Sequence, residues 1–231
     1  MKNKLVLSSI IGLTAVSLAQ AQPITLVNPS FEQPGTTKIS TGWSTVPGWG
    51  YFNGAGAASD SGVENDAPLN GVMNAYMYAA DSHAGIYPSQ QTGYSIVGGE
   101  NIQLTFDAKY SYGSTGPGGG WSQPMSAPEQ VQADLYYVSG GVPVVFASDV
   151  ITWDASGAGV PWASYVFTGS APLAAAGNLL GVDFKNVSAD PNYYNWAEVD
   201  NVGLNVVPEP ASMALIGLGG LALVVFRRRS A

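Results

Sequence analysis

Residues 102–112 read IQLTFDAKYSY, and this stretch decides the fold. Its hydrophobic residues occupy every even position, from Ile102 to Tyr112, and its polar residues occupy every odd position, from Gln103 to Ser111. Successive side chains of a β-strand point to opposite faces of the sheet. The alternation therefore predicts a strand with one face on a hydrophobic core and the other in water.

Further strands are predicted on both sides of this stretch. Alternating or short hydrophobic runs occur at residues 24–27, 72–78, 131–138, 142–147, 162–168 and 179–185. Ser139, Gly140 and Gly141 join two of these runs, and glycine permits the positive φ angles that a hairpin turn requires. Turn-forming residues interrupt the chain about every 8 to 12 residues, and we identify no amphipathic helix before residue 207. We therefore expect an all-β domain of antiparallel strands.

The last predicted strand changes its alternation midway. Apolar residues stand at odd positions up to Val199 and at even positions from Val202 onward. One extra residue in a strand exchanges its two faces, so a β-bulge near residues 200–201 would restore the pattern. Bulges of this kind often redirect side chains toward a site.

The end of the chain combines three features in a fixed order. They are Pro208, Glu209 and Pro210, an uncharged segment at residues 211–226, and Arg227, Arg228 and Arg229. A helix needs roughly 17 to 25 apolar residues to cross a bilayer, so residues 211–226 lie at the short end of that range. Flanking basic residues stay on the cytoplasmic side, which leaves the rest of the chain outside. We predict one transmembrane helix here rather than a buried core helix, because core helices do not end a chain in three arginines.

The start of the chain is typical of a secretory signal peptide, residues 1–21. Lys2 and Lys4 precede an apolar segment, and Ala19 and Ala21 form the small-residue site at which a signal peptidase cleaves. The mature chain would then begin at Gln22. The alternative, an uncleaved anchor, fits less well because the apolar segment is short and the cleavage site follows it directly.

Residues 22–207 remain for a single domain large enough to bury a substantial core. They contain three lysines, no arginine and 15 acidic residues, which gives a net charge of −12. Such a domain repels nucleic acid and anionic lipid, whose binding requires basic residues. Cysteine is absent, so thiol chemistry and cysteine-bound zinc are excluded.

The end of the chain resembles the PEP-CTERM sorting signal of Gram-negative bacteria. The resemblance rests on Pro208, Glu209 and Pro210, the short hydrophobic helix and the terminal arginines. It implies that an exosortase in the inner membrane recognises this segment and delivers the protein to the cell surface or the extracellular matrix. Cleavage of the tail and its retention both stay open.

The mature domain resembles galactose-binding-like jelly rolls of the carbohydrate-binding-module kind. The resemblance rests on LVNPSFE at residues 26–32, QQT at 90–92, LTFDA at 104–108 and VDNVGL at 199–204, with PGW at 47–49 and two glycines at 98–99. It implies a two-sheet antiparallel jelly-roll β-sandwich whose first and last strands are adjacent. Pro29 stands where the family more often has glycine.

The same resemblance implies one structural calcium ion between Glu32 and Asp200. Calcium takes 6 to 8 hard oxygen ligands, so carboxylates and backbone carbonyls from two neighbouring segments could surround it. The alternative is that both carboxylates accept hydrogen bonds from backbone N–H groups at strand ends. The residues alone leave these readings evenly balanced.

Several aromatic residues in irregular segments are candidates for sugar binding. Flat rings stack on sugars while nearby polar groups orient hydroxyls, and loops on a rigid sandwich often carry such residues. The candidates are Trp43, Tyr51, Trp121, Trp153, Tyr193 and Tyr194. For any one ring the alternative is packing in the core or under a loop, which we expect for Trp49 and Trp196.

The sequence predicts binding rather than catalysis. His83 is the only histidine, and no serine lies in a nucleophile elbow. We therefore expect a surface or extracellular-matrix protein that is not an enzyme and whose sandwich binds polysaccharide. The first alternative is a purely structural protein that binds no particular sugar. A glycan hydrolase that uses two carboxylates ranks third.

Overall fold

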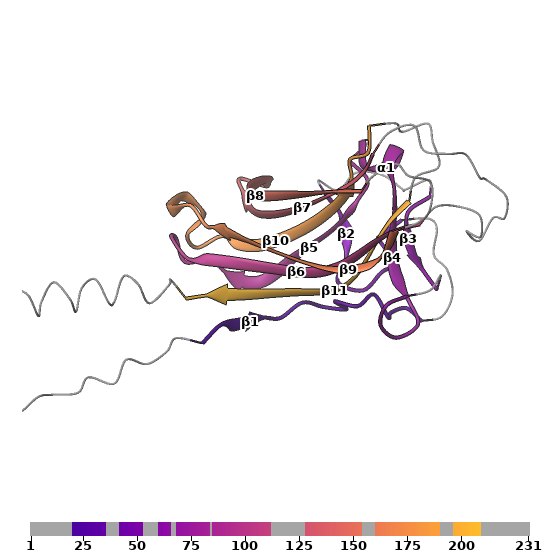
Figure 1. Ribbon diagram of the computed structural model, residues 1–231. Coiled ribbons are helices and arrows are strands. Elements are labelled where there is room, and N and C mark those ends of the chain that lie inside the picture. The colour runs from indigo at the N-terminus through magenta and orange to yellow at the C-terminus, as the bar shows by residue number, and fades with distance from the viewer. Residues whose placement is uncertain are drawn as a thin grey trace, which may run out of the picture. The chain divides into compact units, whose positions relative to one another are not determined.

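A computed structural model (Figure 1) describes residues 20–35, 42–52, 60–65, 68–83, 85–111, 128–153, 160–189 and 196–208. The predicted transmembrane helix, the arginine cluster and most of the signal peptide lie outside these ranges. Within these ranges, no helix has the length and apolar character needed to cross a bilayer.

Two antiparallel sheets form a β-sandwich, as predicted (Figure 1). One sheet has the order β3-β4-β11-β6-β9, with β1 also paired to β11, and the other has the order β2-β5-β10-β7-β8. The strands of the first sheet are β1 (Gln22–Ile24), β3 (Gly62–Glu64), β4 (Asn74–Tyr78), β6 (Asn101–Ser111), β9 (Val160–Ser170) and β11 (Trp196–Val207). The strands of the second are β2 (Gly50–Tyr51), β5 (Pro88–Ser95), β7 (Glu129–Ser139), β8 (Val142–Trp153) and β10 (Leu179–Asn186). A short helix, α1 (Ala79–His83), and a 3₁₀ turn, η2 (Leu173–Ala175), complete the described elements.

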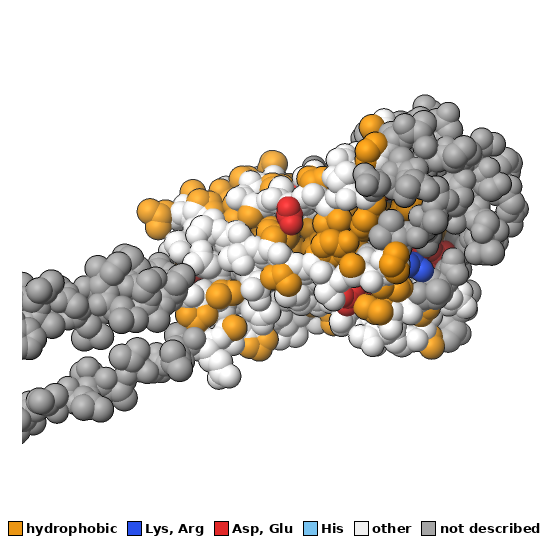
Figure 2. All heavy atoms as spheres, in the orientation of Figure 1, with side chains coloured by type: hydrophobic (Ala, Val, Ile, Leu, Met, Phe, Trp, Pro, Cys, Tyr) orange, Lys and Arg blue, Asp and Glu red, His pale blue; other side chains and the backbone are white. Residues whose placement is uncertain are grey.

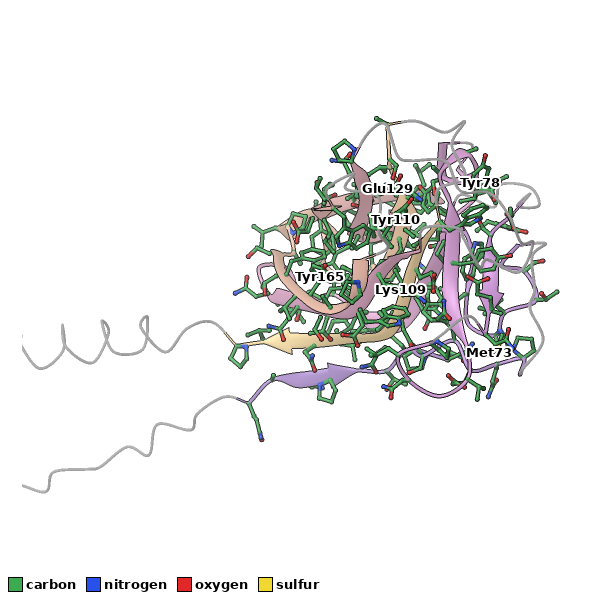
Figure 3. All side chains as sticks on the ribbon, turned by 45° about the vertical axis from the view of Figure 1, so that its right-hand side comes forward. Met73, Tyr78, Lys109, Tyr110, Glu129 and Tyr165 are labelled. Atoms are coloured by element: carbon green, nitrogen blue, oxygen red, sulfur yellow. The ribbon has the colours of Figure 1, made fainter. Side chains whose placement is uncertain are left out.

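The stretch that decides the fold becomes β6, which pairs with both β9 and β11. Its even-numbered residues Ile102, Leu104 and Phe106 belong to the core between the sheets. Side chains fill the space between the two sheets (Figure 3). The rings of Phe106 and Phe184, from opposite sheets, meet at 5.0 Å between centroids. The core face of the predicted strand is therefore confirmed, but the opposite face is only partly in water, because Asp107 and Lys109 are buried.

The predicted hairpin, bulge and adjacent terminal strands are also confirmed. β7 and β8 are joined through Gly140 and Gly141, both of which have positive φ. The β6–β11 register shifts between Asp200 and Gly203, and Asn201 has a φ of 55°. The first strand pairs with the last, although β1 ends earlier than expected, at Ile24.

The chain that follows β1 folds inward around Phe31. The Phe31 ring packs against the ring of Trp49 at 4.7 Å and against the ring of Trp43 at 6.2 Å between centroids. Trp49 donates a hydrogen bond from Nε1 to the carbonyl oxygen of Asn28. This aromatic group closes one part of the core, so Trp49 is a core residue as predicted.

Candidate functional site

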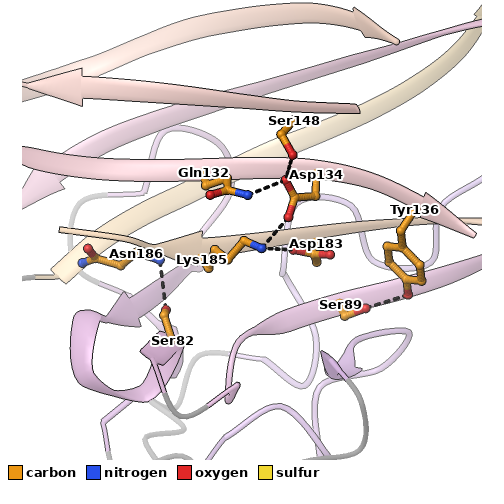
Figure 4. A network of polar contacts seen from close by, with 9 residues as sticks. All are labelled: Ser82, Ser89, Gln132, Asp134, Tyr136, Ser148, Asp183, Lys185 and Asn186. Carbon is orange, nitrogen blue, oxygen red and sulfur yellow. Dashed lines mark hydrogen bonds and ion pairs between the residues drawn. The ribbon is translucent and has the colours of Figure 1, made fainter. Parts of the chain in front are cut away.

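The outer face of the five-stranded sheet carries a cluster of charged and aromatic side chains. Leu180, Val182 and Phe184 of β10 belong to the core, so the intervening residues point to the opposite face. There Asp183 lies directly opposite Asp134 of β7 in the strand register. We call this cluster the Asp183 site; its members are Phe52, Tyr87, Ser89, Gln132, Asp134, Tyr136, Ser148, Asp183 and Lys185 (Figure 4 draws all but Phe52 and Tyr87).

The ion pair of the Asp183 site joins Lys185 to Asp134. Lys185 Nζ lies 2.5 Å from Asp134 Oδ2 and 3.9 Å from Asp183 Oδ1 (Figure 4). Asp134 Oδ1 also accepts hydrogen bonds from Gln132 Nε2, at 2.8 Å, and from Ser148 Oγ. Lys185 and two hydrogen bonds therefore stabilise the charge of Asp134, whereas Lys185 stabilises a charge on the more distant Asp183 less.

Asp183 differs from the other buried acids of the described chain. It is 0% exposed and receives no hydrogen bond as a carboxylate; Asp134 is its hydrogen-bond partner when it carries a proton, and Lys185 Nζ lies 3.9 Å away. Burial raises the pKa of Asp183 well above its usual range, and the negative charge of Asp134 raises it further while Lys185 opposes the change. By contrast, the buried Glu198 on the other sheet contacts Lys109 Nζ at 2.8 Å and Asn74 Nδ2 at 2.7 Å.

Aromatic rings surround the carboxyl pair. The Tyr136 ring lies across Gly181, where a Cβ atom would come within 2.1 Å of the tyrosine Cζ atom. Its hydroxyl group reaches Ser89 Oγ at 2.7 Å, and burial raises the pKa of Tyr136 to about 12. Phe52 meets the Tyr136 ring edge-on at 5.4 Å and stacks on Tyr87 at 4.9 Å.

Lys185 connects the ion pair to these rings. Its Nζ atom lies 5.2 Å from the ring centroid of Tyr87 and 5.9 Å from that of Phe52. Burial also raises the pKa of Tyr87, so this phenol stays uncharged. The arrangement combines one cation, two carboxyl groups and three rings on one rigid sheet. It can hold a ligand that has both an apolar face and hydrogen-bonding groups.

The sequence analysis missed this site. The signal in the sequence is weak: Asp134, Asp183 and Lys185 stand at the outward positions of two predicted strands. Such positions are expected to face water, and nothing local shows that rings cover them. Their proximity comes from the β7–β10 register.

The predicted aromatic candidates lie elsewhere. Trp43 is 0% exposed and packs on Phe31, while Trp153 is 6% exposed and donates a hydrogen bond from Nε1 to Tyr165 at 3.0 Å. Neither ring offers a free face to a sugar, because the segments that carry them fold against the core. Tyr51 is half-buried in β2. Trp121, Tyr193 and Tyr194 lie outside the described residues.

Trp196 lies on the outer face of the six-stranded sheet rather than in the core. It is half-buried and stacks at a tilt on Tyr78, with 5.9 Å between the ring centroids. Its Nε1 donates a hydrogen bond to Asp60 Oδ2 at 3.0 Å. The expectation of a core position fails here because the strand register turns the indole outward, on the side opposite Ala197.

The two predicted calcium ligands bind the same loop. Glu32 accepts hydrogen bonds from the backbone N–H groups of Val72 and Met73, and Asp200 accepts them from those of Asn70 and Asn201. These are the contacts expected if both carboxylates accept hydrogen bonds from the backbone instead of binding calcium. The described residues contain no group of three or more acidic or histidine side chains that could hold a metal ion. A calcium ion would need backbone carbonyl groups as further ligands, and it stays a prediction.

Calcium is expected to raise the melting temperature of the protein more at pH 7 than at pH 4. Burial raises the pKa of Asp200 to about 6, and the charges of Glu32 and Asp107 contribute. The stability that comes from protonating Asp200 is present below pH 4 and is lost as the pH rises through 6, where a cation would replace the proton. Thermal melts with calcium and with a chelator measure this difference, with Asp200→Asn as the control that removes it. Identical melts at pH 7 with either reagent would eliminate the calcium site.

The comparisons with solved structures first define the class of fold. A Stig cyclase from Fischerella sp. TAU, in complex with an indole compound, has a TM-score of 0.57 at 18% identity, covering 83% of this chain and 100% of that chain. A second cyclase from the same source has a TM-score of 0.55 at 20% identity, again covering 83% and 100%. The xylan-binding CBM22-1 domain of Paenibacillus barcinonensis Xyn10C reaches 0.45 at 14% identity over the same shares of the two chains. At these identities the likeness concerns the fold alone.

The family comparison then concerns the end of the chain. Residues 206–229 match the PEP-CTERM protein-sorting motif. This confirms the predicted sorting signal and indicates an exported protein that is sorted to the surface or the exterior. No curated protein matches the sequence.

One prediction from the sequence is contradicted. We expected a protein that is not an enzyme, yet the solved structures that share its fold include cyclases, which are enzymes. A sandwich of this kind therefore does not by itself argue against catalysis, and the expectation had relied on the absence of a serine–histidine site.

Proposed function

We propose that this protein is an exported exosortase substrate whose β-sandwich binds an uncharged polysaccharide. Signal peptidase would release the mature chain before Gln22, and residues 211–226 would hold it in the inner membrane until the exosortase acts. The sorting motif supports the export pathway. The polysaccharide would then be met at the cell surface or in the extracellular matrix.

The observation that carries the binding proposal is the composition of the outer face of the five-stranded sheet. Phe52 keeps part of its ring in water beside Lys185, while Gln91 and Ser148 are exposed on the same face. Sugars need an aromatic surface next to hydrogen-bonding groups, and this face offers both. The binding surface would thus be a sheet face rather than the loop aromatics predicted from the sequence.

The charge of the domain favours an uncharged sugar. Residues 22–207 carry a net charge of −12, which would repel uronates or sulfated glycans. On the face drawn in Figure 2, hydrophobic side chains, uncharged polar side chains and backbone make up most of the described surface, and charged side chains are few. This surface suits a neutral polymer.

Phe52→Ala is expected to weaken binding of a neutral polysaccharide about tenfold, because it removes one ring that stacks on the sugar. A tenfold loss of affinity corresponds to about 1.4 kcal/mol, which is in the range that one aromatic contact contributes. A glycan array identifies the ligand, and calorimetry on the purified full chain measures the affinity. Thr168→Ala is the matched control, because Thr168 is exposed on the other sheet. Equal affinities for wild type and Phe52→Ala would exclude the sheet face as the binding surface.

The second candidate is a structural protein without specific sugar binding. The burial of Trp43 and Trp153 favours it, because two of the predicted stacking rings stabilise the fold instead. If the wild-type protein binds no glycan on the array, the structural role is favoured over sugar binding.

A further inference from the structure

One end of the β-sandwich is the end from which the chain continues to the sorting motif. β11 ends there at Val207, and β1 begins there at Gln22, which lies opposite Val206 (Figure 1). Two connections cross between the sheets at the same end: residues 96–100 join β5 to β6, and residues 171–178 join β9 to β10. The β7–β8 turn lies there as well, because the end of β7 pairs with the start of β10. We call this the exit end; it comprises Gln22, Val207 and residues 95–101, 139–144 and 170–179.

The exit end carries the most exposed large hydrophobic side chains of the described chain. Leu173 is 81% exposed, Val97 63% and Val142 61%, and they come from three different connections between strands. Leu179, at the start of β10, is exposed as well. Single exposed hydrophobic residues are common on protein surfaces, but several at one end mark a contact with another protein or with a membrane.

The backbone under these side chains is held by hydrogen bonds. Ile96 donates a backbone hydrogen bond to residues 171–178 and accepts one from them, both at 2.9 Å. Ala171 does the same with residues 96–100, at 2.8 Å in both directions. The exposure of Leu173 is therefore a property of the folded domain.

The exit end is almost free of charge. Glu100 carries its only charged side chain, which accepts hydrogen bonds from Tyr94 Oη at 2.6 Å and from the backbone N–H of Val97 at 2.7 Å. The remaining acidic residues of the domain lie outside the exit end. Because those acids repel a bilayer that contains anionic lipid, the exit end is the part of the domain that can approach lipid.

The length of the chain after β11 sets how far the exit end can lie from a membrane. Ala211, the first residue of the predicted transmembrane segment, is four residues beyond Val207. An extended residue spans at most about 3.6 Å, so the two residues lie within about 14 Å of each other. A tether this short keeps the bilayer at a high effective concentration, so even a weak hydrophobic contact with it is populated.

We propose that the exit end is a membrane-contact surface. While the tail is retained, its exposed aliphatic side chains lie in the headgroup layer on the outer side of the inner membrane. The contact holds Pro208, at the start of the Pro-Glu-Pro sequence, at the bilayer surface where a membrane-embedded exosortase acts. This inference rests on the proposed tether at residues 211–226 and is independent of sugar binding.

The first test places one fluorescent probe on the full chain in phosphatidylcholine vesicles, which the absence of cysteine makes straightforward. Lipids that carry a spin label near the headgroup should quench a probe on Leu173→Cys at least about twofold more than a probe on Thr152→Cys, because only the first contacts lipid. Thr152 is exposed near the end of β8 that lies away from the exit end, so it is the matched control.

A second test changes the surface and reads the contact from a probe on Val142→Cys. Leu173→Glu should lower the quenching of that probe by lipid at least about twofold, because a carboxylate is costly to move out of water. Val166→Glu adds the same charge at an exposed position within β9 and should leave the quenching unchanged. Both substitutions are at exposed positions, so both proteins are expected to fold.

Flotation of the vesicles separates this inference from the proposed function. If the chain does not float with the vesicles, the tether is wrong and the membrane-contact surface falls with it. If the chain floats but the probes on Leu173→Cys and Thr152→Cys are quenched equally, only the membrane-contact surface is excluded. A Leu173→Cys probe that is shielded from water but not quenched by lipid would indicate a protein partner, such as a second copy of the chain, and would equally overturn the inference.

Discussion

Phe31→Ala is expected to lower the free energy of unfolding by about 3–5 kcal/mol, as is typical when a buried phenylalanine is truncated. Phe31 is 0% exposed, and its ring lies between those of Trp43 and Trp49. Trp49 in turn contacts Phe184 of the core, at 6.3 Å between centroids. Loss of the Phe31 ring leaves a cavity between two indoles that are held in place by the chain around them. Urea denaturation of the purified protein measures the change.

Leu173→Ala is the control for this prediction. Leu173 is 81% exposed in η2, so its truncation should change the free energy of unfolding by no more than about 0.5 kcal/mol. The backbone gives a second check, because Phe31 has a φ of 56°, in the left-handed region that favours glycine. Phe31→Gly also loses the ring, but glycine adopts this φ without strain. It should therefore destabilise the protein less than the loss of the ring alone would. A Phe31→Ala protein as stable as Leu173→Ala would show that the aromatic group does not stabilise the fold.

Much of the fold follows from local patterns. The alternation at residues 102–112 specifies which face of β6 is buried, and the two glycines after Ser139 specify a turn. The change of alternation after Val199 locates the bulge, because one inserted residue must exchange the faces of β11. These features need only neighbouring residues to be read, so the sequence suffices.

Other parts of the fold depend on contacts that neighbouring residues do not reveal. β3 is three residues long and buried on both faces, so it shows no alternation, and β2 has only two residues. The Asp183 site depends on pairing between β10 and β7, which lie far apart in the sequence. Asp183 reads as a water-facing position in a strand, yet it is a fully buried acid that lies near Tyr87 and Tyr136. The indoles of Trp43 and Trp153 look the same in sequence whether they are buried or exposed.

Lys185→Met is expected to lower the free energy of unfolding by about 3–5 kcal/mol, the usual cost of removing one partner from a buried ion pair. The Asp134 side chain is 0% exposed and would keep its charge without the cation that lies 2.5 Å away. Hydrogen bonds from Gln132 and Ser148 would remain but supply no full positive charge. Urea denaturation again measures the change.

The double variant Asp134→Asn/Lys185→Met removes both charges, so it should recover most of the stability that Lys185→Met loses. The two single variants and the double variant form a cycle, and a coupling of at least about 1 kcal/mol is expected between residues in direct contact. Additive effects would mean that Lys185 and Asp134 do not stabilise each other. The cation would then be free to serve Asp183, and the protonated state of that acid would lose its physical basis. Strong coupling assigns Lys185, the one cation that the described residues place near the two acids, to Asp134, and Asp183 must then remain uncharged to stay buried.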